Sequence, residues 1–188
     1  PSLLHIGTLA TAIEPGASVL FDWAMGVSEL APIIFDPNIR PAVIPDRDKY
    51  RAQVEKWIGI SSVVKVSEDD IAWLYPGEDD VEIAKKWVDG DVSLVVITRG
   101  ANGLVGVTKS GVYTVPGFKV NVIDTIGAGD TVGAVIAEAV AQIGLDELTD
   151  GPLLVALEKA ARAAAYTCSK KGAQPPTLKE LNDINAIY

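Results

Sequence analysis

The sequence has very little of the residues that usually carry redox, zinc or triad chemistry. It contains one cysteine, Cys168, and one histidine, His5, among 188 residues. A single cysteine cannot form an intrachain disulfide, which fits a reducing, intracellular compartment. A single histidine removes most zinc sites and most Ser-His-Asp arrangements. We therefore expect chemistry that depends on neither thiol pairs nor histidine clusters.

Positive charge and long apolar runs are also scarce. The 16 basic residues are outnumbered by 25 acidic ones, and the net charge of −9 repels nucleic-acid phosphates and anionic lipid. The most apolar stretch, Thr131 to Leu145, is interrupted by Glu138 and Gln142 and is too short to span a bilayer. We therefore expect no nucleic-acid partner and no membrane partner.

The length and the first residues bear on domain organisation. A hydrophobic content of 48% in 188 residues is enough for one sizeable core, so one compact domain is expected. The chain opens at Pro1, with neither an initiator methionine nor the basic start of a secretion signal. We expect that a segment upstream has been removed.

Hydrophobic periodicity predicts an α/β fold with a mostly parallel sheet, because short apolar runs alternate with longer amphipathic ones. The predicted strands are Leu3 to Ile6, Ile33 to Phe35, Ser62 to Val66 and Leu94 to Thr98. The predicted helices between them are Pro15 to Leu30, Asp46 to Ile58, Ser67 to Tyr75 and Val81 to Asp89. We expect His5 and the four tryptophans, Trp23, Trp57, Trp73 and Trp87, to be packing residues.

The second half of the chain changes character. Gly103 to Thr108 and Val112 to Val115 flank a glycine-containing turn and predict a hairpin, which is followed by a short strand, Val120 to Val122. Three helices are then predicted: Ala128 to Ile143, Leu153 to Thr167, and a last one from Thr177. Gly151-Pro152 and Gly172 to Pro176 are expected to separate these helices.

The most informative segment is Asp124-Thr125-Ile126-Gly127-Ala128-Gly129-Asp130-Thr131, directly before an apolar helix. Glycines at a helix N-terminus let backbone N–H groups approach an anion, and the helix dipole adds positive potential there. In the first turn, Asp130 could accept a proton from a hydroxyl beside a bound phosphate. The alternative is a tight turn in which Asp130 and Thr131 only cap the helix.

This segment, followed by Val132-Gly133-Ala134, resembles the signature of the ribokinase-like (PfkB-type) carbohydrate kinases, usually Asp-Thr-x-Gly-Ala-Gly-Asp-[Ser/Thr]-Phe. Val132 replaces the usual Phe, a change that affects packing behind the loop more than chemistry. The resemblance implies that Asp130 is the catalytic base. It also implies that the amides of Gly127, Ala128 and Gly129 form an anion hole for the transferring phosphoryl group.

A second segment, Asp36-Pro37-Asn38-Ile39-Arg40, resembles the family's Asp-x-Asn-x-Arg element after a central strand. The resemblance implies that Asp36, Asn38 and Arg40 contribute to substrate binding, by orienting a polyol and neutralising phosphate. The alternative is a proline-framed turn tied by its own Asn and Asp side chains.

A third segment, Lys65 to Asp70, falls where the family places Asn-x-x-Glu, with Ser67 in place of Asn and Asp70 in place of Glu. The resemblance implies a role for Ser67 and Asp70 with Mg²⁺ and the nucleotide phosphates. Both substitutions shorten the reach, which favours metal contacts through water. The same residues fit an N-terminal capping pattern, and the two interpretations are compatible.

Two further segments resemble the family's nucleotide site. Thr98-Arg99-Gly100-Ala101-Asn102-Gly103 is similar to its Thr-x-Gly-x-x-Gly loop, which implies that Thr98, Arg99, Gly100 and Gly103 contact the nucleotide. Ala160 to Gly172 resembles the helix and loop that close the adenine side, and Ala161 stands where many members have Asn. Without a ligand, these would be an ordinary turn and packing alanines.

The placement of these segments supports one site. Asp36 to Arg40, Ser67 to Asp70 and Thr98 to Gly103 all follow predicted strands, which puts them on the carboxyl edge of a parallel sheet. Open α/β sheets bind ligands at that edge.

The resemblance implies ATP-dependent phosphorylation of a sugar hydroxyl by a cytoplasmic, fructokinase-like enzyme. It implies Mg²⁺ near Asp70 and Asp124, with room for a monovalent cation near Asp124, and a homodimer in the full-length enzyme. We expect residues 1–188 to be the C-terminal catalytic and nucleotide-binding part of a single ribokinase-like domain. Without the upstream sugar contacts and lid, the isolated chain is expected to be inactive. A nucleoside kinase of the same fold and a non-catalytic nucleotide-binding fragment are the alternatives.

Overall fold

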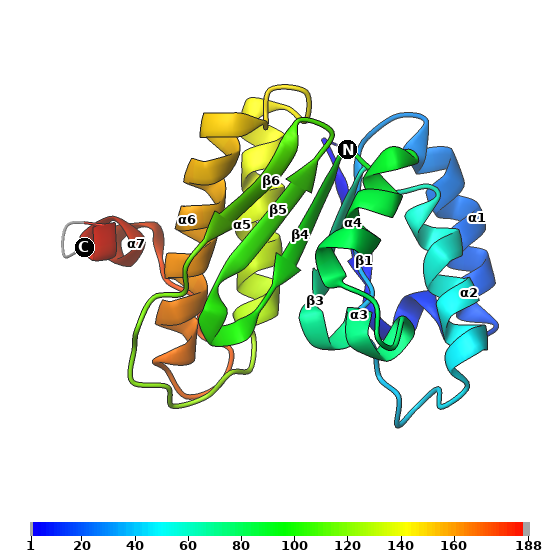
Figure 1. The fold of residues 1–188 in the computed structure, drawn as a ribbon, viewed down its shortest axis with the longest axis horizontal. Coiled ribbons are helices and arrows are strands. Elements are labelled where there is room, and N and C mark those ends of the chain that lie inside the picture. Colours follow the sequence, from blue (N-terminus) through cyan, green and yellow to red (C-terminus); the bar gives the residue numbers. More distant parts are fainter. Residues whose placement is uncertain (1, 186–188) are drawn as a thin grey trace. The chain divides into compact units, whose positions relative to one another are not determined.

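The computed structural model describes residues 2–185, which form alternating strands and helices (Figure 1). The strands are β1 (Leu4–Gly7), β2 (Ile33–Asp36), β3 (Val63–Ser67), β4 (Leu94–Thr98), β5 (Leu104–Thr108) and β6 (Gly111–Val115). The helices are α1 (Gly16–Ser28), α2 (Arg47–Ile58), α3 (Glu68–Leu74), α4 (Asp80–Asp89), α5 (Ala128–Ile143), α6 (Asp150–Cys168) and α7 (Leu178–Asn185). Short 3-10 turns lie at Thr8–Thr11 and Gly100–Asn102.

The six strands form one sheet in the order β1-β2-β3-β4-β5-β6. The pairs β1/β2, β2/β3 and β3/β4 are parallel, so the predicted α/β class with a mostly parallel sheet is confirmed. Neighbours β5 and β6 are joined only by Lys109 and Ser110, which confirms the predicted hairpin.

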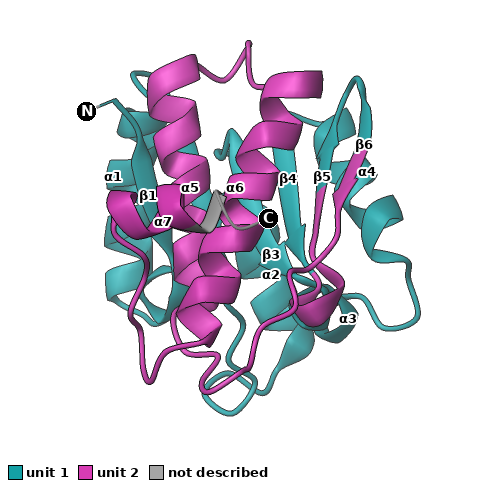
Figure 2. Ribbon diagram, turned by 90° about the vertical axis from the view of Figure 1, so that its left-hand side faces the viewer, with its two compact units in different colours: residues 1–98, 106–112 teal, residues 99–105, 113–188 magenta. Residues whose placement is uncertain are grey.

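The chain divides into two compact units (Figure 2). Unit 1 comprises residues 1–98 and 106–112, and includes β1 to β4 and α1 to α4. Unit 2 comprises residues 99–105 and 113–188, and includes α5 to α7. That residues 1–188 belong to a single domain stays a prediction. In the part of the chain that the structure describes, no helix has the length and apolar character needed to cross a membrane.

The core of unit 1 is built around Trp57 of α2, which is fully buried. Its ring packs edge-on against Phe21 of α1, with centroids 5.1 Å apart, and stacks on Phe35 of β2 at 5.9 Å. Its indole N–H donates to the carbonyl of Thr11 at 2.9 Å, so the polar atom is satisfied inside the core. This aromatic cluster joins α1, α2 and the sheet.

Two packing predictions in unit 1 are wrong. Trp23 is 55% exposed, because α1 turns the face with Phe21 and Ala24 toward the core and Trp23 lies on another face. His5 is exposed as well, on a strand that pairs with β2 alone and stands at the edge of the sheet. Trp73 and Trp87 are half-buried.

The core of unit 2 lies between α5 and α6. The hydroxyls of Thr131 and Thr167 are 2.9 Å apart, and both residues are buried. Each hydroxyl also lies within hydrogen-bond distance of a backbone carbonyl, Thr131 of Gly127 at 2.8 Å and Thr167 of Ala163 at 3.0 Å. Since each hydroxyl has one proton, one threonine donates to its carbonyl and the other donates across to it. The two helices are thus linked by polar contacts one turn into α5, close to the predicted phosphate loop.

Two boundary predictions in unit 2 are wrong. Val120 to Val122 is not a strand, because the chain after β6 is irregular there and Val122 is 60% exposed, without a neighbouring strand. Helix α6 begins at Asp150, so Gly151 and Pro152 lie in its first turn instead of before it. A proline is tolerated there because the first helical N–H groups have no partner inside the helix. Residues 172–176 do separate α6 from α7, as predicted.

Candidate active site

The carboxyl ends of the parallel strands in unit 1 meet at one edge, as predicted. Gly7 at the end of β1 pairs with Asp36 of β2, and Ser67 of β3 pairs with Thr98 of β4. A side chain at Gly7 would put its Cβ 1.9 Å from the carbonyl oxygen of Asp36, so only glycine allows this close approach. Three of the predicted segments therefore begin side by side.

Asp36 is paired with a residue for which the sequence predicted no role. The Nζ of Lys65 lies 2.8 Å from the Oδ2 of Asp36, and both side chains are nearly fully buried, at 7% and 6% exposed. Phe35 pairs with Val64, so the next residues along, Asp36 and Lys65, share one face of the sheet. The signal was a lysine inside an otherwise apolar strand, because buried lysines are rare unless paired.

Asp70 has two structural roles. Its Oδ2 accepts from the amide of Ser67 at 3.4 Å while the Ser67 hydroxyl accepts from the amide of Asp70 at 3.1 Å, a capping box that starts α3. Its Oδ1 accepts from the amide of Ile39 at 3.0 Å. Burial, with the nearby charge of Asp36 as a smaller contribution, raises the pKa of the Asp70 carboxyl above its usual value. The capping interpretation is confirmed, and the metal and nucleotide roles of Ser67 and Asp70 stay predictions.

The three candidate side chains of the Asp36 to Arg40 loop differ in their exposure to solvent. Asp36 is buried, Asn38 is half-buried with a left-handed φ of 42°, and Arg40 is exposed. A guanidinium nitrogen of Arg40 donates to the carbonyl of Ile39 at 3.0 Å. The side chain of Arg40 is therefore more accessible to a substrate than that of Asp36. The binding roles of all three residues stay predictions.

In unit 2, the glycine-rich segment forms the N-terminus of α5. Gly127 has a left-handed φ of 82° and is the residue before the first helical turn. Within residues 2–185, neither its amide nor that of Gly129 donates a hydrogen bond to the protein, whereas the amide of Ala128 donates to the carbonyl of Thr125 at 3.2 Å. Two of the three predicted anion-hole amides are thus available to a ligand.

Asp130 lies in the first turn of α5, as predicted, and its side chain is exposed. Thr131, the next residue, is buried against α6. Since the hydroxyl of Thr131 is held by Gly127 and Thr167, it does not compete for the carboxylate of Asp130. The arrangement leaves an exposed carboxylate beside helix N-terminal amides, which is the chemistry of a base next to an anion site.

Asp124 anchors the start of this loop. Its Oδ1 accepts from the amide of Ile126 at 3.0 Å and its Oδ2 from the amide of Gly172 at 2.9 Å. These two bonds, with a weaker one from Thr125, lower the pKa of the Asp124 carboxyl below its usual value. Both oxygens are already acceptors within the protein, so any contribution of Asp124 to a cation site would be shared with this anchoring role.

The nucleotide-loop candidates fall in both units. Thr98 ends β4 in unit 1 and is half-buried. In unit 2, the amide of Arg99 donates to the carbonyl of Gly103 at 2.9 Å and closes the loop, and Gly100 has a left-handed φ of 51°. Ala161 is buried within α6, so its side chain packs inside unit 2. The nucleotide roles of these residues stay predictions.

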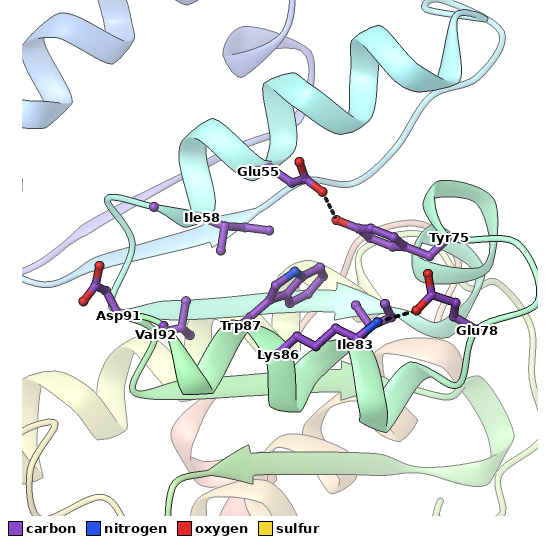
Figure 3. Close-up of a pocket in the computed structure, with 11 residues that line it drawn as sticks. Glu55, Ile58, Tyr75, Glu78, Ile83, Lys86, Trp87, Asp91 and Val92 are labelled. Carbon is purple, nitrogen blue, oxygen red and sulfur yellow. Dashed lines mark hydrogen bonds and ion pairs between the residues drawn. The ribbon is translucent and has the colours of Figure 1, made fainter.

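A cavity of about 480 Å³ lies elsewhere in unit 1 (Figure 3). Tyr75 and Trp87 line it, together with Glu55, whose carboxylate accepts from the Tyr75 hydroxyl at 2.9 Å. Asp91 and Val92, which precede β4, place it at the amino end of that strand, opposite the carboxyl edge. It contains none of the predicted site residues.

The predicted magnesium contacts are Asp70, which lies in unit 1, and Asp124, which lies in unit 2. Within residues 2–185, no three His, Cys, Asp or Glu side chains form a group that could hold a metal. Mg²⁺ usually keeps several waters and takes one or two carboxylates together with substrate phosphates. Asp70 and Asp124 are compatible with such single contacts, and their metal roles stay predictions.

Comparison with known proteins decides the family. Residues 19–180 match the model of the pfkB family carbohydrate kinases, and they include the strand-end loops and the α5 N-terminus described above. The chain belongs to this family. The resemblance seen in the Asp124 to Thr131 segment is therefore confirmed.

Among the curated relatives of this pfkB-family chain are fructokinases. It is 38% identical over 129 residues to a fructokinase of Rhizobium leguminosarum bv. trifolii, covering 69% of this chain and 39% of that protein. It is 32% identical over 191 residues to fructokinase-2 of Oryza sativa subsp. japonica, covering 97% of this chain and 55% of that protein. The chain thus spans about half the length of these relatives or less.

A solved structure supports the fold. A fructokinase double mutant from Vibrio cholerae O395, with fructose, ADP and potassium bound, superposes with a TM-score of 0.83 at 27% identity. The match covers 98% of this chain and 59% of that chain. The predicted ribokinase-like fold class is confirmed.

Proposed function

We propose that the protein carrying this chain is an ATP-dependent sugar kinase with Asp130 as its catalytic base. The observation that carries the proposal is the N-terminus of α5, where the amides of Gly127 and Gly129 are free of protein acceptors within residues 2–185 and Asp130 is exposed beside them. A helix N-terminus favours an anion such as a phosphoryl group. A carboxylate in the same helical turn is suited to take the proton of the attacking hydroxyl.

In this proposal, the residues around α5 hold charge and move one proton. The side chain of Asp130 accepts the proton of the sugar hydroxyl, and the amides of Gly127 and Gly129 stabilise negative charge on the transferring phosphoryl group. Mg²⁺, when bound with ATP, neutralises the phosphate oxygens. Thr131 and Asp124 keep the loop in place through Gly127, Thr167 and Gly172.

Fructose is the proposed acceptor. The two curated relatives are fructokinases, and the Vibrio cholerae structure contains fructose, ADP and potassium. This supports ATP as donor, and it supports the proposal of a monovalent cation near Asp124. Arg40, with Asn38 and Asp36 behind it, is proposed to contact the sugar or its phosphate. We also propose that the full-length enzyme is a homodimer in the cytoplasm.

The test is a coupled ADP-release assay on the full-length gene product with ATP, Mg²⁺ and a panel of sugars and nucleosides. We expect turnover with fructose that is at least about tenfold above the rate without acceptor. Faster turnover with a nucleoside would favour the nucleoside kinase instead. Nucleotide binding without turnover on any acceptor would contradict enzymatic function and favour a binding protein.

A further inference from the structure

Lys65 is the buried charged residue of unit 1 for which the family motifs provide no role. It lies in β3 between Val64 and Val66, both fully buried, and its own side chain is 7% exposed. Taking an ammonium group out of water costs several kcal/mol unless it is paired, so a lysine here needs a partner. That partner is Asp36, at 2.8 Å.

The pair lies at the base of the Asp36 to Arg40 loop. Lys65 holds Asp36, the residue at which β2 ends and the loop begins. Three residues later, the amide of Ile39 donates to Asp70 at 3.0 Å. Two contacts from the β3–α3 segment therefore bracket Pro37 and Asn38. Asn38 has a left-handed φ of 42°, a conformation that asparagine tolerates in turns.

The charges make Lys65 the critical member of this arrangement. Asp36 and Asp70 are close enough for the charge of one to affect the other, and burial already disfavours the ionised form of Asp70. The Oδ1 of Asp36 is buried and has no hydrogen-bond partner within residues 2–185. The negative charge of Asp36 is therefore balanced at Oδ2, by the ammonium group of Lys65.

We propose that Lys65 is a positioning residue for sugar binding, which acts by fixing Asp36 and thereby the loop that presents Asn38 and Arg40. The inference rests on the proposed sugar kinase function. It goes beyond that function by assigning acceptor affinity to a residue that does not itself touch the substrate. Loss of Lys65 should loosen the loop and weaken sugar binding, and it should leave the α5 N-terminus intact.

The experiment uses the full-length protein and the variants Lys65→Met, Asp36→Asn/Lys65→Met and, as matched control, Lys86→Met. Lys86 is an exposed lysine of the same unit, ion-paired with Glu78 at 2.5 Å. Hydrogen exchange by mass spectrometry follows peptides covering residues 37–44 and, for comparison, 47–58. Steady-state assays measure kcat and KM for fructose and for ATP separately.

For Lys65→Met we expect exchange in residues 37–44 to accelerate at least about tenfold while residues 47–58 change little, as a local opening predicts. We expect KM for fructose to rise about tenfold or more, with KM for ATP within about twofold, because the ground-state sugar contact is lost. The double variant should be more stable than Lys65→Met, since no lone carboxylate is left buried, yet keep the raised KM. Lys86→Met should match the wild type in both measurements.

Unchanged exchange in residues 37–44, or an unchanged KM for fructose in folded Lys65→Met, would overturn the proposal. If Lys65→Met does not fold, the double variant decides, and a wild-type KM for fructose there would also overturn it. An inactive wild type would contradict the proposed function instead, while the exchange measurement would still test whether Lys65 fixes the loop.

Discussion

The carboxylate of Asp124 accepts a hydrogen bond from the amide of Gly172, which lies 48 residues further along the chain, at 2.9 Å. Its other oxygen accepts from the amide of Ile126, two residues ahead. One side chain therefore ties the loop before α5 to the segment after α6. The first residue of the family motif acts here as a structural anchor, and it connects the motif to the segment that follows α6.

Replacing Asp124 with Ala should release both amides. We expect hydrogen exchange at Ile126 and Gly172 to be several-fold faster at neutral pH, because each loses its acceptor. Asp146→Ala, an exposed residue of the same unit, is the matched control and should leave both amides unchanged. Equal exchange in Asp124→Ala and the wild type, measured by NMR, would contradict the anchoring role.

Gly127→Ala should destabilise the protein. Gly127 has a left-handed φ of 82°, so alanine there costs about 1–2 kcal/mol of backbone strain, and the new Cβ would also lie 2.7 Å from the Cβ of Ala173. Gly26→Ala is the control, because Gly26 lies in α1 with open space around it and alanine is the better helix former. Urea unfolding of both variants measures the free energy of unfolding. A Gly127→Ala variant as stable as the wild type would contradict the strain assigned to this position.

The carboxyl of Glu180 should titrate far below its ordinary range. Hydrogen bonds from the Tyr166 hydroxyl and then from Thr177 lower the pKa of Glu180 to about 2. A pKa that folding depresses stabilises the folded state fully above the unfolded value, 4.5, and this contribution is lost as pH falls through about 2. Carboxyl NMR titration should give that midpoint, and Tyr166→Phe should move it upward. A midpoint that Tyr166→Phe leaves unchanged would contradict the assigned cause.

The sequence predicted best where periodicity and local chemistry agree. The four parallel strands, the hairpin and the cap of α3 by Ser67 and Asp70 follow from patterns of adjacent residues, and all are present. The strand predicted at Val120 to Val122 was wrong because a strand needs a neighbouring strand, which local alternation does not reveal. The start predicted for α6, after Gly151-Pro152, was wrong because this pair is compatible both with a turn and with the first turn of a helix.

The tertiary relationships in the site could not be predicted from the chain alone. Lys65 is 29 residues from Asp36, and the only local signal of this contact is a charge in an apolar strand. Asp70 is 31 residues from Ile39, and that contact has no local signal. The same holds for Asp124 and Gly172. The motif predicted which residue types lie at the α5 N-terminus, and only the structure shows what holds them.

The turnover number of Asp130→Asn in the full-length protein, beside Asp146→Asn as control, tests most directly whether Asp130 is the catalytic base. An amide has nearly the shape of the carboxylate but is a negligible base, so we predict a kcat for fructose lowered by about 10²-fold or more, with KM for ATP little changed. Asp146→Asn should retain wild-type turnover. If Asp130→Asn kept more than roughly a tenth of the wild-type kcat, Asp130 would not be the catalytic base.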